Sequence, residues 1–320
     1  EHAGETVHMV VSAVTREWAR LAPLSTGRKK QSSEEAGEDE KEEDRRLKRL
    51  RHTVISWLSA TCPDYDTLHC CPIESHLPVL VPMLIQALEE SDPDLAWQAQ
   101  GCAELAANTP LHRANGVLSK VLEAMHTVAQ SSSWQVRSAV LPFLQVIVYR
   151  HQFLISPESM REIQGLMIEL LSDSQVEVRE MASSSVAVLV RICGESLALE
   201  LLGSFTGWSQ EPLLVRGSGD EDPSAAAARS KALQTRHAGV LGLAALIAAY
   251  PYDMPSWMPG VLVRLAKFVS DPNPIRTTIK KAFGEFWRTH QDTWPMLKEK
   301  FTDDQLFSLT NLLASPAYFS

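Results

Sequence analysis

Three cysteines and a histidine in "TCPDYDTLHCC" are the residues best suited to chemistry in this sequence. Thiolate and imidazole groups bind zinc, so Cys62, His69, Cys70 and Cys71 form a candidate metal site. Structural zinc sites pair their cysteines at C-x₂₋₄-C spacing, whereas two of these cysteines are adjacent and no second pair follows. The sequence therefore favours buried free thiols, and we expect no metal and no cofactor.

Catalytic motifs are absent from the sequence. It contains no G-x-S-x-G elbow, phosphate-binding loop, G-x-G-x-x-G fingerprint or H-E-x-x-H pair. The glycines of "RGSGDEDP" lie among acidic residues, which would repel a phosphate. His290 and Asp292 in "RTHQDTW" have no nucleophile at a recognisable spacing, so a polar turn between helices explains them better. We expect a protein that is not an enzyme.

Composition narrows the class of protein further. The 320 residues carry a formal net charge of −9, which argues against nucleic acid as the main partner, because phosphate binding needs a basic surface. No apolar run reaches the roughly 18 residues of a membrane span. Five cysteines make no disulfide framework, which indicates a reducing compartment. The first residue is not Met, so we expect a piece of a longer protein.

Helical periodicity dominates the pattern of apolar residues. In "HLPVLVPMLIQALEESD", Leu77, Leu80, Leu84 and Leu88 recur at helical spacing. A short polar loop followed by an apolar helix then recurs four times, in "SDPDLAWQAQGCAELAA", "SSSWQVRSAVLPFLQVI", "SDSQVEVREMASSSVAVLV" and "SDPNPIRTTIKKAFGEFW". No convincing strand alternation appears, so an all-α fold is predicted.

An arginine recurs with this pattern. Arg137, Arg179 and Arg276 follow the polar loops, and Arg236 fits the series without a loop before it. Their spacings are about 42, 57 and 40 residues, close to a HEAT or armadillo unit. Since one helix pair cannot bury its apolar face alone, we expect an α-solenoid of stacked pairs. Each arginine should cap loop carbonyls or pair with a neighbouring repeat's aspartate.

Two stretches break the pattern. "GRKKQSSEEAGEDEKEEDRRLKRLRH" is dense in charge, so we expect its first half to be disordered; its basic ends resemble a bipartite nuclear-import signal, and a solvated linker is an equal alternative. A Gly/Asp/Ala-rich loop near residues 216–231 should be flexible. The predicted organisation is a helical segment (1–25), a disordered charged linker (26–45), HEAT-like repeats (46–205), an insertion loop (206–234), C-terminal repeats (235–314) and a docking tail (315–320).

The last predicted helix and the residues after it form a distinct unit. Thr302 and Gln305 have the spacing of a capping box, and Pro316 should stop the helix. Beyond it, Tyr318 and Phe319 precede Ser320. Such a tail suits a pocket that offers a lysine to a terminal carboxylate and an apolar slot to the rings. Folding of these rings onto the last repeat is an equal alternative.

Long runs of this sequence resemble a known family. "RHAGVLGLAALIAAYPYDMPSWMPGVLVRLAKFVSDPNPI", "FWRTHQDTW" and "FTDDQLFSLTNLLASPAYFS" are similar to the C-terminal region of the proteasome activator complex subunit 4 family, and the resemblance covers roughly residues 75–320. It implies a HEAT-repeat activator that caps the 20S proteasome without ATP, located in the nucleus and cytoplasm. The implied partner is the 20S α-ring, with neither DNA nor membrane bound.

The resemblance also assigns roles to individual residues. The family ends in a hydrophobic–Tyr–any motif that inserts between α-subunits, which places Tyr318, Phe319 and Ser320 in the proteasome-binding tail. Phe319 keeps the ring of the family's tyrosine and lacks its hydroxyl, so docking is expected and gate opening is less assured.

The resemblance also implies a bromodomain-like segment within residues 46–205, which would bind acetylated histones. The family's acetyl-lysine pair falls on Cys193 and Gly194 here, and neither residue supplies the amide donor or ring wall of that site. Helical-repeat packing is therefore the favoured interpretation of this segment, and a scaffold that binds acetylated histone tails is the alternative function. Inositol phosphate is a family ligand whose residues cannot be mapped onto this sequence.

Overall fold

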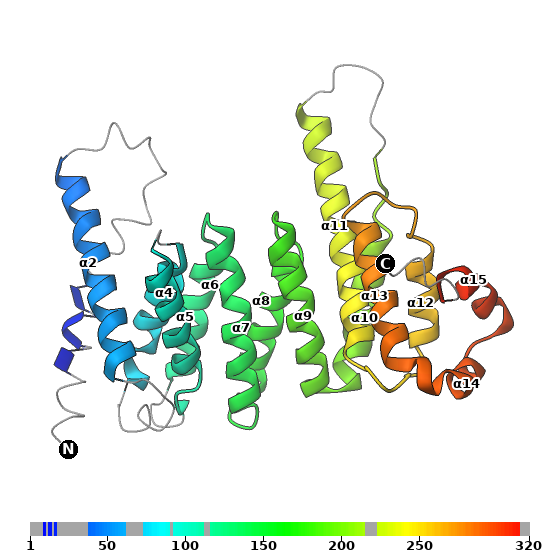
Figure 1. The fold of residues 1–320 in the computed structure, drawn as a ribbon, viewed down its shortest axis with the longest axis horizontal. Helices are drawn as coiled ribbons and strands as arrows, with labels where there is room; N and C mark the ends of the chain where they lie inside the picture. Colours follow the sequence, from blue (N-terminus) through cyan, green and yellow to red (C-terminus); the bar gives the residue numbers. More distant parts are fainter. Residues whose placement is uncertain are drawn as a thin grey trace. The chain divides into compact units, whose positions relative to one another are not determined.

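A computed structural model describes residues 9–10, 12–14, 16–17, 38–61, 73–89, 92–111, 116–214 and 223–313. Every regular element in these ranges is helical. The α-helices are α2 (Glu38–Thr61), α4 (Leu77–Gln86), α5 (Pro93–Ala107), α6 (Val117–Ala129), α7 (Trp134–His151), α8 (Pro157–Leu170), α9 (Val176–Cys193), α10 (Glu195–Ser209), α11 (Pro223–Ala248), α12 (Met258–Ala266), α13 (Ile275–His290), α14 (Trp294–Leu297) and α15 (Asp303–Leu313) (Figure 1). The predicted all-α solenoid of HEAT- or armadillo-like helix pairs is confirmed.

The chain divides into two compact units, residues 1–163 and 164–320, with the boundary inside α8. In the first unit, α4 packs against α5 and α6, while α2 lies on α5 and α7 lies on α6. The predicted periodic leucines Leu77, Leu80 and Leu84 are almost fully buried in this core. Helix α4 begins at Leu77, and its second residue is Pro78, which is favoured in the first turn because proline has no backbone N–H to donate.

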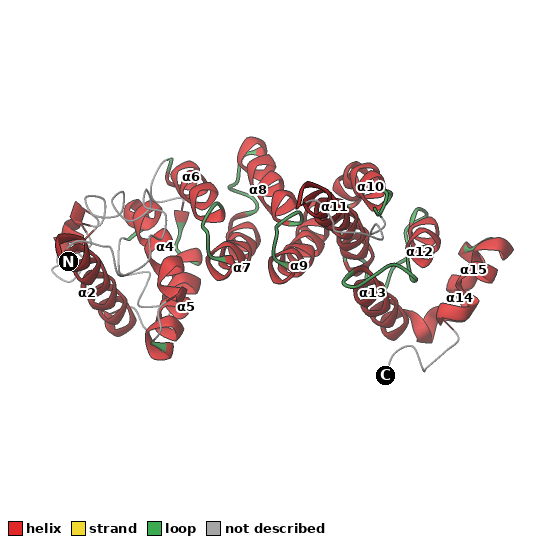
Figure 2. Ribbon diagram, turned by 90° about the horizontal axis from the view of Figure 1, so that it is seen from above, coloured by secondary structure: helices red, strands yellow, loops and turns green. Residues whose placement is uncertain are grey.

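In the second unit, α11 is the central element. It packs against α10, α9 and α13, and α12 packs against α15. Figure 2 shows α10 and α12 on one side of this unit and α9 and α13 on the other. Two glycines permit the close approach of α10 and α11. A Cβ on Gly239 would meet the backbone of Trp208 and Ser209, and one on Gly242 would meet the ring of Phe205.

Two predicted boundaries need correction. The charged linker was expected to run from 26 to 45, yet α2 already begins at Glu38. Its charged residues are good helix formers, and Glu42 forms ion pairs with Arg45 and Arg49 at 3.2 and 2.7 Å along the helix. The sequence pattern had marked these residues as disordered because they lack apolar side chains.

The insertion loop was predicted over 206–234, yet α10 continues to Ser209 and α11 begins at Pro223. Residues 225–228 are four consecutive alanines, and alanine has the highest intrinsic helix propensity of any residue type. Proline is favoured at the first helical position, which Pro223 occupies here. The small side chains that resemble a flexible loop in the sequence therefore extend α11 instead.

Candidate functional site

A buried polar network joins three helices of the second unit. Nε of Arg179 on α9 donates to Nδ1 of His237 on α11 at 3.0 Å, and Nε2 of that histidine lies 2.9 Å from Oγ1 of Thr278 on α13. Because the arginine can only donate, Nδ1 must accept, so Nε2 carries the proton and donates to Thr278. The histidine is completely buried. The network therefore fixes α9, α11 and α13 relative to one another.

The recurrent arginines perform the predicted structural roles. Arg179 also donates through Nη1 to the carbonyls of Asp173 and Ser174, at 2.6 and 3.0 Å, in the loop before its helix. The same loop-capping contact is made by Arg137 to Ser131 and Ser132, and by Arg276 to Ser270. Nε of Arg236 pairs with Oδ2 of Asp271 at 2.8 Å, in the loop before α13. Both predicted modes, carbonyl capping and pairing with a neighbouring repeat, are confirmed.

An open groove lies beside this network. It has a volume of about 300 Å³ and is lined by α9, α11 and α13. Leu241, Ala244, Ala245 and Ala248 recur at i, i+3, i+4 and i+7, so they present one face of α11 to the groove. Alanine side chains are too short to fill the space between the flanking helices, which leaves this face hollow. Periodicity alone could not reveal this groove, because its walls come from helices far apart in sequence.

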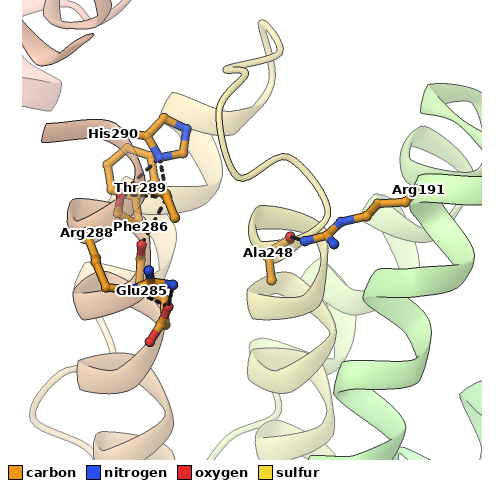
Figure 3. A network of polar contacts seen from close by, with 7 residues as sticks. All are labelled: Arg191, Ala248, Glu285, Phe286, Arg288, Thr289 and His290. Atoms are coloured by element: carbon orange, nitrogen blue, oxygen red, sulfur yellow. Dashed lines mark hydrogen bonds and ion pairs between the residues drawn. The ribbon is translucent and has the colours of Figure 1, made fainter. Parts of the chain in front are cut away.

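Charged side chains surround the groove. Arg191, Lys281 and Arg288 line it together with Glu180 and Glu285. Figure 3 shows Arg191 reaching towards the end of α11, where its Nη2 donates to the carbonyl of Ala248 at 2.6 Å. It also shows Arg288 beside Glu285. Nε and Nη2 of the arginine donate hydrogen bonds of 3.0 and 2.6 Å to Oε2 of the carboxylate.

His290 lies at the end of the groove and is not part of a catalytic pair with Asp292. Its ring is fully buried and stacks on Phe286, with centroids 4.4 Å apart. Its Nδ1 lies 2.9 Å from the carbonyl of Phe286, and its Nε2 lies 3.3 Å from that of Asp253. The histidine therefore joins the end of α13 to the loop before α12.

The predicted acetyl-lysine residues lie outside the groove. Cys193 is the last residue of α9, and its sulfur accepts a long contact of 3.9 Å from Nε2 of Gln164. Gly194 follows with φ of 85°, a left-handed conformation that separates α9 from α10. Burial raises the pKa of the Cys193 thiol. These contacts describe a helix junction, in keeping with the packing interpretation.

The predicted docking residues Tyr318, Phe319 and Ser320 lie outside the described residues, as do the four candidate zinc ligands at 62–71. Within the described part of the chain, no group of three or more His, Cys, Asp or Glu residues could hold a metal ion. The same residues include no helix that meets the length and hydropathy needed to cross a membrane.

The helix that leads to the tail is formed as predicted. The backbone N–H of Thr302 donates to Oε1 of Gln305 at 3.0 Å, and the N–H of Gln305 donates to Oγ1 of Thr302 at 3.3 Å. These reciprocal bonds are the predicted capping box. Phe301 and Leu309 are buried, which anchors α15 against α12.

Comparison with known proteins relates this chain to one family. Residues 233–320 match the family model described as "Proteasome activator complex subunit 4-like, C-terminal". Over 315 residues the chain is 33% identical to Proteasome activator complex subunit 4A of Danio rerio, covering 94% of this chain and 17% of that protein. The resemblance to the proteasome activator complex subunit 4 family is confirmed.

Other members of this family extend the relationship. Proteasome activator complex subunit 4 of Homo sapiens is 34% identical over 289 residues, covering 90% of this chain and 16% of that protein. Proteasome activator BLM10 of Saccharomyces cerevisiae is 26% identical over 186 residues, covering 54% of this chain and 8% of that protein. The chain thus spans about one sixth of the length of the first proteasome activator relatives that it matches.

Among solved structures, a computationally designed armadillo repeat protein aligns with 75% of this chain and 95% of its own. The TM-score is 0.31 and the identity 14%. That superposition is too loose to refine the fold derived above.

The buried histidine should make the second unit sensitive to acid. Burial, reinforced by the guanidinium of Arg179, lowers the pKa of His237 from 6.5 to about 3. Below pH 6.5 this histidine binds a proton in the unfolded chain, whereas the buried native imidazole stays neutral down to about pH 3. The free energy of unfolding therefore has its full value above pH 6.5 and decreases as the pH falls towards 3. The loss approaches about 1.4 kcal/mol per pH unit within this window.

The variant His237→Gln tests this dependence, because an amide supplies one acceptor and one donor without titrating. Urea unfolding at several pH values between 7 and 4 should show a shallower decline for the variant than for the parent. Identical slopes for the two proteins would contradict the assignment of the acid sensitivity to this residue.

Proposed function

We propose that this chain belongs to a non-catalytic activator that caps the 20S proteasome without ATP and docks through Tyr318, Phe319 and Ser320 between α-subunits. The support is similarity to proteasome activator subunit 4 proteins along 94% of the chain, together with a family model that extends to residue 320. In this proposal the helical units form part of the cap, and the protein acts in the nucleus and cytoplasm.

The chemistry of the tail accounts for docking. With Ser320 as the terminal residue, its carboxylate can accept a charge-assisted hydrogen bond, which contributes about 1.5–3 kcal/mol. A buried aromatic ring contributes roughly the same again. The loss of translational and conformational freedom offsets much of this gain, so the tail alone should bind weakly. Helix α15 precedes the tail, and its capping box and the buried Leu309 hold this helix in place, which should reduce that loss.

Phe319 sets the expected limit of activation. A phenylalanine keeps the apolar ring and supplies no hydroxyl, so any hydrogen bond made by a tyrosine at this position is absent. We therefore expect Phe319→Tyr to bind the 20S particle at least as well as the parent and to stimulate peptide hydrolysis more.

Deletion of Tyr318–Ser320 is the direct test. Co-sedimentation of the purified protein with 20S particles should weaken about tenfold or more, because both rings are lost and the chain's carboxylate moves back to Ala317, three residues from its docking position. The control is Phe307→Ala, which alters an exposed aromatic on α15 and leaves the tail intact. Unchanged binding after the deletion would refute tail docking.

Binding of acetylated histone tails, the alternative function, is not supported by the residues at the corresponding positions. The thiol of Cys193 faces Gln164 at a helix junction, and Gly194 has no side chain to form the wall of a pocket. We therefore do not advance it as a second function.

A further inference from the structure

The groove between α9, α11 and α13 lies beside the buried network described above, and its chemistry points to a ligand of its own. Its floor is the hollow face of α11 formed by Leu241, Ala244, Ala245 and Ala248. Ala248 is exposed and Ala244 is half-buried, so the floor is open to solvent. Small apolar side chains of a partner could fill this space and remove apolar surface from water.

The charge of the groove differs from that of the whole chain. Three cations (Arg191, Lys281 and Arg288) line it against two anions (Glu180 and Glu285), whereas the chain carries a net charge of −9. Local positive charge on an acidic protein favours an acidic partner and disfavours a basic one.

The two arginines are already oriented. Arg191 uses Nε and Nη2 to bind the carbonyls of Ala249 and Ala248 at 3.2 and 2.6 Å, at the end of α11. Arg288 uses Nε and Nη2 to bind Glu285. A guanidinium has five N–H donors, so each arginine retains donors for a ligand. Lys281 forms no ion pair with any residue that the structure describes.

The same arrangement selects against a phosphate-rich ligand. Glu285 lies in the groove beside Arg288 and would repel a compact polyanion. A single carboxylate needs only one such cation, and the alanine floor requires apolar neighbours on either side of it.

We propose that this groove binds a short extended segment of a partner protein in which one Asp or Glu is flanked by small apolar residues. The carboxylate binds a cation that α13 presents to the groove, Lys281 or Arg288, and the apolar side chains lie on Ala244 and Ala248. Peptide binding to this groove is measured without the 20S particle, so its test does not depend on proteasome binding.

Fluorescein-labelled hexapeptide pools provide the probe. Each pool fixes Glu, Gln, Lys or phosphoserine at one central position and varies Ala, Val and Leu around it. Fluorescence anisotropy with the 320-residue chain should show the Glu pool binding about tenfold more tightly than the Gln and Lys pools, and more tightly than the phosphoserine pool. Equal binding of all pools, or no binding of the Glu pool at millimolar concentration, would overturn the proposal.

Matched variants locate the binding. Lys281→Glu and Arg288→Glu should each weaken the Glu pool several-fold, whereas Lys280→Glu makes the same charge change on α13 outside the groove lining and should not. Ala244→Trp should block binding by filling the floor, with circular dichroism as the check on folding. Equal losses for Lys280→Glu and Lys281→Glu would show non-specific attraction. Tighter binding after removal of residues 314–320 would identify the chain's own tail as the occupant and reject a partner segment.

Discussion

Replacing Gly239 with alanine should destabilise the second unit by about 3 kcal/mol or more. A Cβ at this position of α11 would lie 2.6 Å from the carbonyl carbon of Trp208 and 2.7 Å from Cα of Ser209. These atoms belong to the backbone of α10, so no side chain can rotate away and the two helices must separate. Their separation would also disturb the ring of Phe205, which is buried against Gly242.

Gly203→Ala is the matched control, because a Cβ on this glycine of α10 meets nothing within 4 Å. Alanine is the better helix former, so this change should stabilise the protein by about 0.5–1 kcal/mol. Urea unfolding of both variants measures the contrast. A similar change in the free energy of unfolding for Gly203→Ala and Gly239→Ala would show that close helix approach is not what requires the glycine.

Arg179→Ala should be the most damaging change among the recurrent arginines, at about 3 kcal/mol. It leaves Nδ1 of His237 without its donor in a fully buried site, and it uncaps the carbonyls of Asp173 and Ser174. Buried polar groups that lose a charged partner carry their full desolvation penalty. Thermal and urea unfolding of the purified variant give the size of the loss.

Arg276→Ala provides the comparison at an equivalent position of the repeat. Its guanidinium makes one exposed bond of 3.4 Å to the carbonyl of Ser270, so its removal should change the free energy of unfolding by less than about 1 kcal/mol. If the two alanine variants lose the same stability, the contact with His237 contributes nothing beyond loop capping.

The helical fold is predictable because the signals of each helix, apolar spacing and capping residues, lie within its own segment of sequence. Leu77, Leu80 and Leu84 are buried as their spacing predicts, and Thr302 and Gln305 form their capping box. Intrinsic helix propensity and the pattern of apolar residues disagree only in segments that contain few large apolar side chains. The ends of α2 and α11 were therefore placed wrongly, although their Glu, Lys and Ala residues favour helix.

The candidate sites were less accessible to sequence reasoning. Arg179 is recognisable through its recurrence, whereas its partner His237 lies 58 positions away and no sequence pattern links the two residues. The groove depends on alanines in α11, which resemble ordinary core residues in a one-dimensional pattern. Contacts between distant helices create both features, and one sequence does not state which helices become neighbours.

The three-helix hydrogen-bond network has a consequence for how the protein loses its structure. Arrays of helical repeats can unravel from an end, one repeat after another, when neighbouring repeats are weakly coupled. Here, unfolding of α13 would remove Thr278, the hydrogen-bond partner of His237 on α11. That histidine also accepts a hydrogen bond from Arg179 on α9. Partial unfolding at this position is thus penalised, and the three helices should melt as one cooperative block.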